Sequence, residues 1–249
     1  MLMLADIARA IDPVLLARGC SIEPDPWQAE LLTQRPTRSL LLCARQTGKS
    51  TITALMAIWV ALYEAPALVL LVSPSQRQSG ELFRTVMQFH SNLEGAPPLT
   101  AESALRAEFS NGSRILALPG SERTVRGYAA ADLVVIDEAA RVEDELLAAL
   151  RPMMATRSNA RLVALSTPAG KRGWFYETWT SGQEWHRVKI PASKCPRITK
   201  AFLDEELREL GAQRFSEEYE LAFIEPNEAV FPSEIIAAAF SQEVTPLWQ

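Results

Sequence analysis

The chain has 249 residues, of which 48% are hydrophobic and 22% are charged, and its formal net charge at pH 7 is −5. This composition excludes a largely disordered chain, and the length suffices for one α/β domain with a small addition. The sequence holds two histidines and three widely spaced cysteines, and no two cysteines have C-x-x-C spacing. It therefore gives little support to a zinc site or a disulfide framework, and it favours a reducing, cytoplasmic compartment.

The charge is distributed unevenly along the chain. Residues 201–249 hold eleven acidic residues and two arginines, a net charge of −9, whereas residues 151–200 hold ten basic residues and two glutamates, a net charge of +8. A basic segment of this kind can contact a polyanion such as a nucleic acid, or it can be a solvated surface without a partner. Charge alone leaves both interpretations open.

One apolar segment, 52–72, has the composition of a membrane span, since Glu64 is its single charge. Pro66 interrupts it, helix formers precede Glu64, and "ALVLLV" is typical of a buried strand. We therefore expect a buried helix followed by a buried parallel strand. The opening "MLMLADIARAID", interrupted by Asp6 and Arg9, lacks the pattern of a cleavable signal, and we expect no membrane partner.

Apolar runs of β type alternate with helical patterns along the chain. In chain order, we expect strands at 39–43, 67–73, 132–137 and 161–167, and helices at 50–63, 80–93 and 143–155. This alternation is typical of a mainly parallel sheet with helices on both faces. The pair Asn111-Gly112 in "AEFSNGSRILAL" predicts a hairpin, and so an antiparallel addition to the sheet.

The last quarter of the chain has a different pattern. A further strand is expected at 185–190, and prolines follow it. Thr199 can cap a helix that stops at Gly211, and a second helix is expected from about Ala212 to Phe223. This acidic part is too short to hold a core alone. We accordingly divide the chain into a main α/β domain, 1–198, and an acidic helical linker subdomain, 199–249.

The stretch "LLLCARQTGKST" ends like a phosphate-binding loop, whose usual pattern is G-x-x-x-x-G-K-[ST]. Gly48, Lys49 and Ser50 match, whereas Cys43 stands where the first glycine is usual. An apolar run precedes the loop and a helical pattern follows it, which places phosphates at a helix N-terminus. Lys49 would bind the outer phosphates, and the hydroxyl of Ser50 would be a ligand of a magnesium ion. Because Cys43 ends a strand, it needs no left-handed backbone, and glycine is dispensable there.

The second motif, "LVVIDEAA", is an apolar run that ends in two acidic residues. Ligands of open α/β sheets bind at the carboxyl ends of the strands, so Asp137 and Glu138 are expected beside the phosphate loop. Asp137 would hold magnesium, and Glu138 would polarise the attacking water. Without the phosphate loop, two acids that meet solvent at a strand end would be an equally good interpretation.

Two other motifs are less specific. In "ALSTPAG", Ser166 and Thr167 end an apolar run and could relay the loss of a γ-phosphate to the following segment, although a plain turn explains them nearly as well. In "PDPWQAELL", Trp27 could pack beneath an adenine and Gln28 could hydrogen-bond its edge. The start of an amphipathic helix is the simpler interpretation of that stretch.

These four motifs, in this order, resemble the ATPase domain of the large terminase subunit, the DNA-packaging motor of tailed phages and herpesviruses. The resemblance runs over about residues 24–236, from "DPWQAELL" through "CARQTGKST", "TVRGYAAADLVVIDEAA" and "LSTPAGKRGWFYETW" to "FSEEYELAFIEPNEAVFPSEI". In that family the loop often lacks its first glycine and carries an arginine. The resemblance implies a P-loop NTPase fold of the additional-strand, catalytic-glutamate type, with a mainly parallel sheet flanked by helices and a small helical linker subdomain.

The resemblance also implies a function. The chain would couple hydrolysis of ATP with Mg²⁺ to translocation of double-stranded DNA into a procapsid, in the cytoplasm of an infected host cell. Its partners would be DNA, the portal of the procapsid, the small terminase subunit and further copies of itself, as a homo-oligomeric ring on assembly and a monomer in isolation. Large subunits usually continue into an RNase H-like nuclease, and we expect no nuclease activity from this chain.

Two other functions compete with this one. A helicase-like, nucleic-acid-dependent ATPase should carry a second RecA-like lobe with arginine motifs, which about 50 acidic residues cannot build. The other is a non-hydrolysing, nucleotide-gated assembly module, which would have no use for Glu138. A phosphate-release assay separates such a module from an ATP-hydrolysing motor.

Several arginines and lysines complete the predicted site. The resemblance implies that Arg45 contacts phosphate or a neighbouring lid. Arg126, with Arg123 in reserve, lies in the loop before the Asp-Glu strand, at the end far from its own nucleotide, so it would act as a catalytic arginine on a neighbour in a ring. A surface arginine is the alternative. The predicted nucleotide-binding residues are Trp27, Gln28, Arg45, Gln46, Thr47, Gly48, Lys49, Ser50 and Thr51, and the predicted DNA contacts are Lys171, Arg172 and Lys189.

Overall fold

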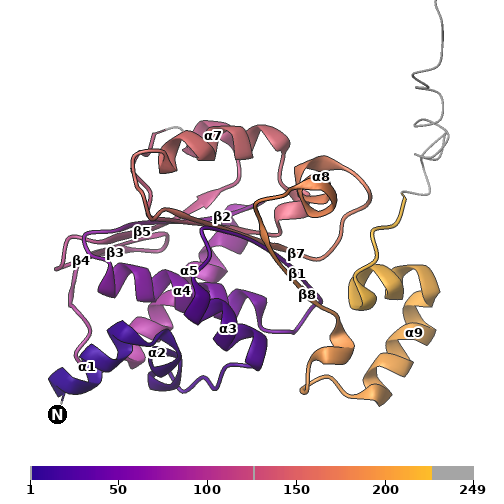
Figure 1. The fold of residues 1–249 in the computed structure, drawn as a ribbon, viewed down its shortest axis with the longest axis horizontal. Coiled ribbons are helices and arrows are strands. Elements are labelled where there is room, and N and C mark those ends of the chain that lie inside the picture. The colour runs from indigo at the N-terminus through magenta and orange to yellow at the C-terminus, as the bar shows by residue number, and fades with distance from the viewer. Residues whose placement is uncertain (1, 126, 226–249) are drawn as a thin grey trace, which may run out of the picture.

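The computed structural model describes residues 2–125 and 127–225, and these form one eight-stranded sheet between two layers of helices (Figure 1). The strand order is β3-β4-β5-β2-β6-β7-β1-β8. The run from β5 to β8 is parallel, and β4 pairs antiparallel with both β3 and β5. The strands are β1 (Arg38–Cys43), β2 (Leu68–Ser73), β3 (Leu99–Ser103), β4 (Arg106–Phe109), β5 (Arg114–Pro119), β6 (Leu133–Asp137), β7 (Arg161–Ser166) and β8 (His186–Ile190).

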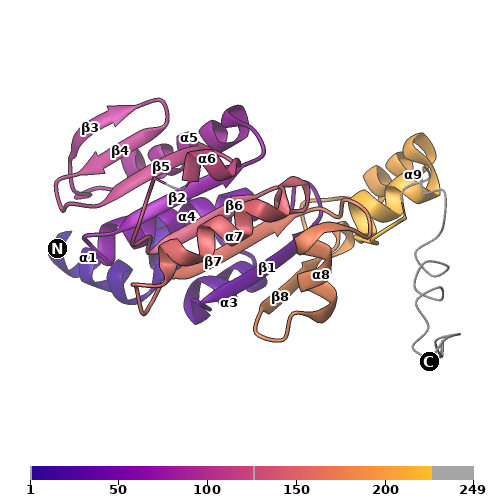
Figure 2. The same cartoon turned by 90° about the horizontal axis from the view of Figure 1, so that it is seen from above.

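Helices cover both faces of the sheet. One layer holds α1 (Leu2–Ile11), α2 (Pro13–Gly19), α3 (Pro26–Gln34), α4 (Lys49–Tyr63) and α5 (Gln76–Asn92). The other layer holds α6 (Glu122–Val125), α7 (Asp144–Met154) and α8 (Gly173–Ser181). The acidic helix α9 (Lys200–Phe215) lies outside both layers, beyond one end of the sheet (Figures 1 and 2).

The central strands are continuously apolar because helices bury both of their faces. Strands β2, β6 and β7 are buried along their whole length. Helix α4 is buried from Ile52 to Leu62, between the sheet and neighbouring helices, which explains the apolar segment 52–72. Among the described helices, none is both long and apolar enough to cross a membrane.

Strand β7 lies between β1 and β6, and this confirms the predicted P-loop NTPase fold of the additional-strand type. The strand that leads into the phosphate loop, β1, pairs with β7, and β7 in turn pairs with β6, so one strand separates the loop from the Asp-Glu strand. All three strands are parallel, and their register sets Leu41 of β1 and Asp137 of β6 level with Leu165. The three carboxyl ends therefore meet at one edge of the sheet.

The predicted hairpin is present between β4 and β5. Gly112 has a left-handed φ of 85°, and the side chain of Asn111 accepts a hydrogen bond from the Ser113 N–H at 3.0 Å. Strand β3 was not predicted, because its side chains are mostly exposed and carry no apolar alternation.

Within the described residues, the linker differs from the prediction only at the end of its second helix. Thr199 caps α9 as expected, since its hydroxyl accepts a hydrogen bond from the Phe202 N–H at 3.2 Å. Gly211 has φ 75° and ψ 162°, which is not helical, so the first helical segment of α9 ends there as predicted and a second segment starts after the kink. The chain continues into a π-helical turn, η3 (Ser216–Glu220), and Leu221 ends it with a φ of 64°. The predicted second helix is therefore present after Gly211, but it ends at Leu221 and not at Phe223.

Candidate nucleotide site

The phosphate loop joins the end of β1 to the start of α4. Cys43 stays in the strand, as predicted, while Gln46 and Gly48 take left-handed φ values of 61° and 84°. A side chain at position 48 would be strained by that φ, and its Cβ would lie 2.6 Å from Gln28 Nε2. The second glycine of the motif is therefore required here, whereas the first is dispensable.

The loop ends at the N-terminus of a long buried helix, where free backbone N–H groups favour an anion. Lys49 is the first residue of α4, and only 9% of it is exposed. Its Nζ lies 3.6 Å from Glu138 Oε1. The loop, the start of α4 and β6 therefore converge on one place. A cavity of about 450 Å³ opens there, lined by Arg45, Gln46, Gly48, Lys49, Ser50, Thr51, Gln78, Glu138 and Arg141.

Asp137 and Glu138 leave the end of β6 in different environments. Asp137 is buried, and one of its carboxylate oxygens accepts the Glu138 N–H at 3.0 Å. Burial, with a smaller effect from the neighbouring Glu138 charge, raises the pKa of Asp137 to about 6, although Lys49 acts in the opposite direction. Glu138 has a left-handed φ of 53° and turns its carboxylate toward Lys49.

The buried Asp137 charge has a predictable effect on stability. The pKa of Asp137 rises from 3.8 in the unfolded chain to about 6 in the folded one. Above pH 6, where Asp137 is ionised in both states, this lowers the free energy of unfolding by up to about 3 kcal/mol. We expect Asp137→Asn to melt several degrees above wild type at pH 7.5. The difference should shrink as pH falls from 6 toward 4, where the folded wild type takes up a proton. An Asn variant that melts no higher than wild type at any pH would contradict this.

Residues 40–237 match the family model described as "Terminase large subunit, T4likevirus-type, N-terminal". The match spans more than half of the chain. The chain belongs to this terminase family. No curated protein matches it.

Solved terminase structures share the fold. The "Thermus Phage P74-26 Large Terminase ATPase domain" is 18% identical with a TM-score of 0.73, and the match covers 84% of this chain and 97% of that one. The large terminase of thermophilic bacteriophage D6E in complex with ADP is 9% identical, with a TM-score of 0.60 and coverage of 87% and 53%. The HK97 bacteriophage large terminase is 20% identical, with a TM-score of 0.55 and coverage of 77% and 45%. This chain thus spans about half the length of the D6E and HK97 proteins.

Gln28 of this terminase chain contacts the phosphate loop, and Trp27 packs beside the core. Gln28 is buried, its Oε1 accepts the Asp25 N–H at 2.8 Å, and its Nε2 donates to the Gly48 carbonyl at 3.3 Å. Trp27 is half-buried and packs against the core. Arg197 adds a bidentate pair with Asp25 at 2.8 Å. These contacts brace the loop, and the adenine contacts of Trp27 and Gln28 stay predictions.

Arg45 points away from the buried part of the loop and toward the linker. Its Nε lies 2.7 Å from Glu218 Oε2 in η3. A loop residue thus reaches the segment that follows α9, and the predicted contact of Arg45 with phosphate or a neighbouring lid stays a prediction.

Ser166 and Thr167 lie at the end of β7, and both are buried. The Ser166 hydroxyl accepts the Ala140 N–H at 3.2 Å. Thr167 Oγ1 accepts a hydrogen bond from Arg141 Nη1 at 3.1 Å. Both hydroxyls thus contact the turn that follows Glu138, and their coupling role stays a prediction.

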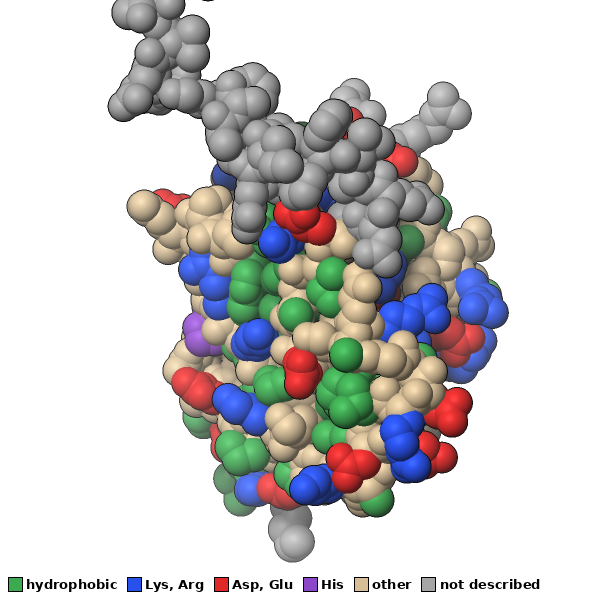
Figure 3. Space-filling model, turned by 90° about the vertical axis from the view of Figure 1, so that its right-hand side faces the viewer, with side chains coloured by type: hydrophobic (Ala, Val, Ile, Leu, Met, Phe, Trp, Pro, Cys, Tyr) green, Lys and Arg blue, Asp and Glu red, His purple; other side chains and the backbone are tan. Residues whose placement is uncertain are grey.

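The three predicted DNA contacts are exposed. Lys171 and Arg172 lie in the segment between β7 and α8, and Lys171 Nζ lies 3.6 Å from Glu225 Oε1. Lys189 is on the edge strand β8. Figure 3 views the end of the molecule that carries α9, and the described basic and acidic side chains there are interspersed. Arg126 lies outside the described residues, and the side chain of Arg123 is likewise not described.

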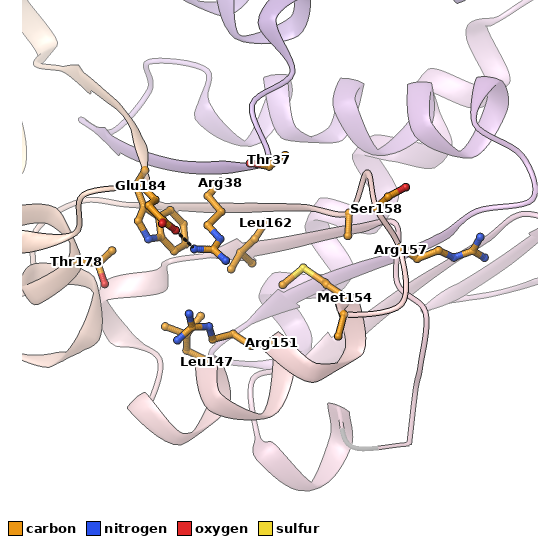
Figure 4. Close-up of a pocket in the computed structure, with 13 residues that line it drawn as sticks. Thr37, Arg38, Leu147, Arg151, Met154, Arg157, Ser158, Leu162, Thr178 and Glu184 are labelled. Atoms are coloured by element: carbon orange, nitrogen blue, oxygen red, sulfur yellow. Dashed lines mark hydrogen bonds and ion pairs between the residues drawn. The ribbon is translucent and has the colours of Figure 1, made fainter.

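A larger cavity, of about 660 Å³, lies at the opposite end of the strands (Figure 4). Thr37 and Arg38 at the start of β1 and Leu162 at the start of β7 line it, and Arg38 is paired with Glu184 at 2.9 Å. Of the predicted site residues that the structure describes, none lines this cavity. Its size alone does not make it the nucleotide site.

Sequence reasoning missed Arg141, which contacts Glu138 and lines the 450 Å³ cavity. A signal was available, since residues three apart meet on one side of a helical turn, and "DEAAR" places the arginine three residues after the glutamate. Gln78 and Arg197 were also missed. They come from distant segments, and no local pattern connects them with the loop.

Proposed function

We propose that this chain is a motor ATPase domain that binds ATP with Mg²⁺ in the 450 Å³ cavity and hydrolyses it to move double-stranded DNA. The observation that carries the proposal is the approach of Lys49 Nζ and Glu138 Oε1 to 3.6 Å at the N-terminus of α4. A buried cation beside a carboxylate, in a pocket of backbone N–H groups, meets the needs of phosphoryl transfer. The family match and the D6E complexes with ADP and ATP-gamma-S support nucleotide as the ligand.

The residues divide the chemistry among them. Lys49 and the N–H groups of the loop would neutralise the outer phosphates as charge develops. Glu138 would accept a hydrogen bond from the attacking water and orient it. Both groups lie at the carboxyl edge of the sheet, because β1, β7 and β6 are parallel neighbours.

Ser50 and Asp137 fit a magnesium ion. Both line a cavity of about 420 Å³ next to the loop, so a hydroxyl and a carboxylate face the same space. Mg²⁺ prefers such oxygen ligands and completes its shell with water and substrate phosphate, so one carboxylate suffices. The ion would supply charge neutralisation between the outer phosphates.

The partners follow from the proposed role in packaging. DNA translocation needs several copies that act in turn, so we place this domain in a homo-oligomeric ring on the portal of a procapsid, with the small terminase subunit as a further partner. Ser166 and Thr167 would connect hydrolysis with the segment that holds Lys171 and Arg172. Arg126, or Arg123, would complete the site of a neighbour, so the isolated domain should be slow.

A phosphate-release assay tests the proposal. The purified chain should release phosphate from ATP in the presence of Mg²⁺, and EDTA should abolish the release. Binding of ATP without any release, even at high protein concentration, would favour a nucleotide-gated assembly module in place of a motor.

Charge reversal tests the DNA contacts. We expect Lys171→Glu with Arg172→Glu to abolish DNA-stimulated ATPase in the assembled motor, because the pair would face the duplex backbone. The wild-type affinity for DNA should fall steeply with salt, by several orders of magnitude per decade if several phosphates are contacted. Arg151→Glu, an exposed arginine beside the 660 Å³ cavity, is the matched control and should have no effect. Packaging that survives the double reversal would place DNA elsewhere.

A further inference from the structure

We propose that Arg141 is a positioning residue for hydrolysis, which holds one carboxylate oxygen of Glu138 so that the other faces the phosphate loop. The inference rests on the proposed function and adds a residue to it. Arg141 ends the short 3-10 helix η1 (Ala139–Arg141), and the left-handed Glu138 is its N-cap residue. The Arg141 N–H bonds to the Glu138 carbonyl at 2.9 Å, so the turn is closed on itself.

The two oxygens of Glu138 have different partners. Oε2 lies 2.7 Å from Arg141 Nη1, a short charge-assisted hydrogen bond, whereas Oε1 lies 3.6 Å from Lys49 Nζ, beyond hydrogen-bond distance. Arg141 is therefore the closer anchor. When Lys49 turns to a phosphate, the bond to Arg141 still fixes the carboxylate, and Oε1 stays directed at the place where the water must be.

Arg141 is itself held by Thr167. The same nitrogen that bonds Glu138 also donates to Thr167 Oγ1 at 3.1 Å, and Thr167 is 1% exposed. The neighbouring Ser166 hydroxyl accepts the Ala140 N–H, so η1 is tied to the end of β7 at two points. A shift of this strand end would move the guanidinium, and with it the carboxylate.

The position of Arg141 also connects two spaces. It lines the 450 Å³ cavity at the phosphate loop and a second cavity of about 720 Å³, which Gly170, Arg172 and the kinked part of α9 also line. Arg141 therefore borders both the proposed nucleotide site and the cavity that Arg172, a predicted DNA contact, also lines. This gives the predicted coupling role of Thr167 a physical route, from Thr167 through Arg141 to Glu138.

Steady-state phosphate release tests the inference. We expect Arg141→Ala to lower kcat by roughly 10- to 100-fold, because a displaced carboxylate no longer aligns the water, while KM and the Kd for ATP stay within about twofold. Because one nitrogen makes both contacts, the ammonium of Arg141→Lys can replace it, and the variant should recover most of the loss. Arg151→Gln is the control for loss of an exposed arginine and should leave kcat unchanged.

Two double variants test the route. Thr167→Val should lower kcat less than Arg141→Ala does, and Thr167→Ser, which keeps the hydroxyl, should lose less than Thr167→Val. The double variant of Arg141→Ala with Thr167→Val should equal Arg141→Ala alone, because both act through one contact. In a Glu138→Gln background, Arg141→Ala should change the residual rate little.

The outcomes separate this inference from the proposed function. If the wild type turns ATP over and Arg141→Ala does so at the same rate, the positioning role is overturned and the function stands. If the losses of the Arg141 and Thr167 variants add, or if Arg141→Ala raises KM and leaves kcat intact, the role is likewise overturned. If the wild type releases no phosphate, the proposed function fails, and this inference fails with it.

Discussion

Glu138→Gln is expected to bind ATP as wild type does and to lower phosphate release by roughly 10²- to 10⁴-fold, the usual contribution of a positioned general base. Glutamine keeps the size of the side chain and can still accept a hydrogen bond from Arg141, so the turn at η1 should persist. It has no negative charge with which to polarise water. ATP affinity from fluorescence titration and single-turnover phosphate release, measured on the same preparation, check the two halves of this expectation.

Asp132→Asn is the matched control, since this acid lies just before β6 and pairs with Arg157 at 3.3 Å, at the opposite end of the strand. It should change stability and leave turnover intact. If Glu138→Gln turned over ATP at the wild-type rate, Glu138 would have no role in the chemistry. Its contacts with Lys49 and Arg141 would then be structural only.

Lys49→Ala is expected to show the second large effect, a loss of ATP affinity together with loss of turnover. The ammonium of Lys49 is nearly buried at the start of α4, so water cannot replace its charge beside the phosphates. Removal of one partner from a desolvated charge contact typically costs about 2 to 5 kcal/mol. Equilibrium binding of ATP and of ADP to the variant measures the loss, which should be larger for ATP because the outer phosphate is the group that Lys49 meets.

Lys200→Ala provides the comparison for Lys49→Ala. Lys200 is also the first residue of a helix, α9, but it is exposed, so its removal should leave ATP affinity unchanged. Equal affinities of Lys49→Ala and wild type for ATP would contradict the phosphate-binding role of the loop.

Much of the fold could be predicted because its signals are local. The four buried strands and the helices between them follow from runs of apolar residues, and the hairpin follows from Asn111-Gly112. The phosphate loop and the Asp-Glu pair were recognisable because each needs a fixed short spacing. Their meeting at one edge followed from the parallel arrangement, since parallel strands bring their carboxyl ends together.

The remaining parts depend on contacts between distant segments. Gln28 braces Gly48, and Arg197 pairs with Asp25 across 172 positions, which no spacing rule could have predicted. In the linker, Gly211 ends the first helical segment as its sequence signature indicates, whereas no local signature predicted that the second segment finishes in a π-helical turn at Leu221. Local patterns therefore located the chemistry, whereas tertiary contacts decide how its residues are held.

The structure of the chain with a non-hydrolysable ATP analogue and Mg²⁺ tests the central claim most directly. In that structure the outer phosphates should lie against Lys49 and the N-terminus of α4, the ion should lie between Ser50 and Asp137, and Glu138 should face the last phosphate. Nucleotide bound elsewhere, as in the 660 Å³ cavity beside Arg38, or phosphates bound without contact to Lys49, would contradict it.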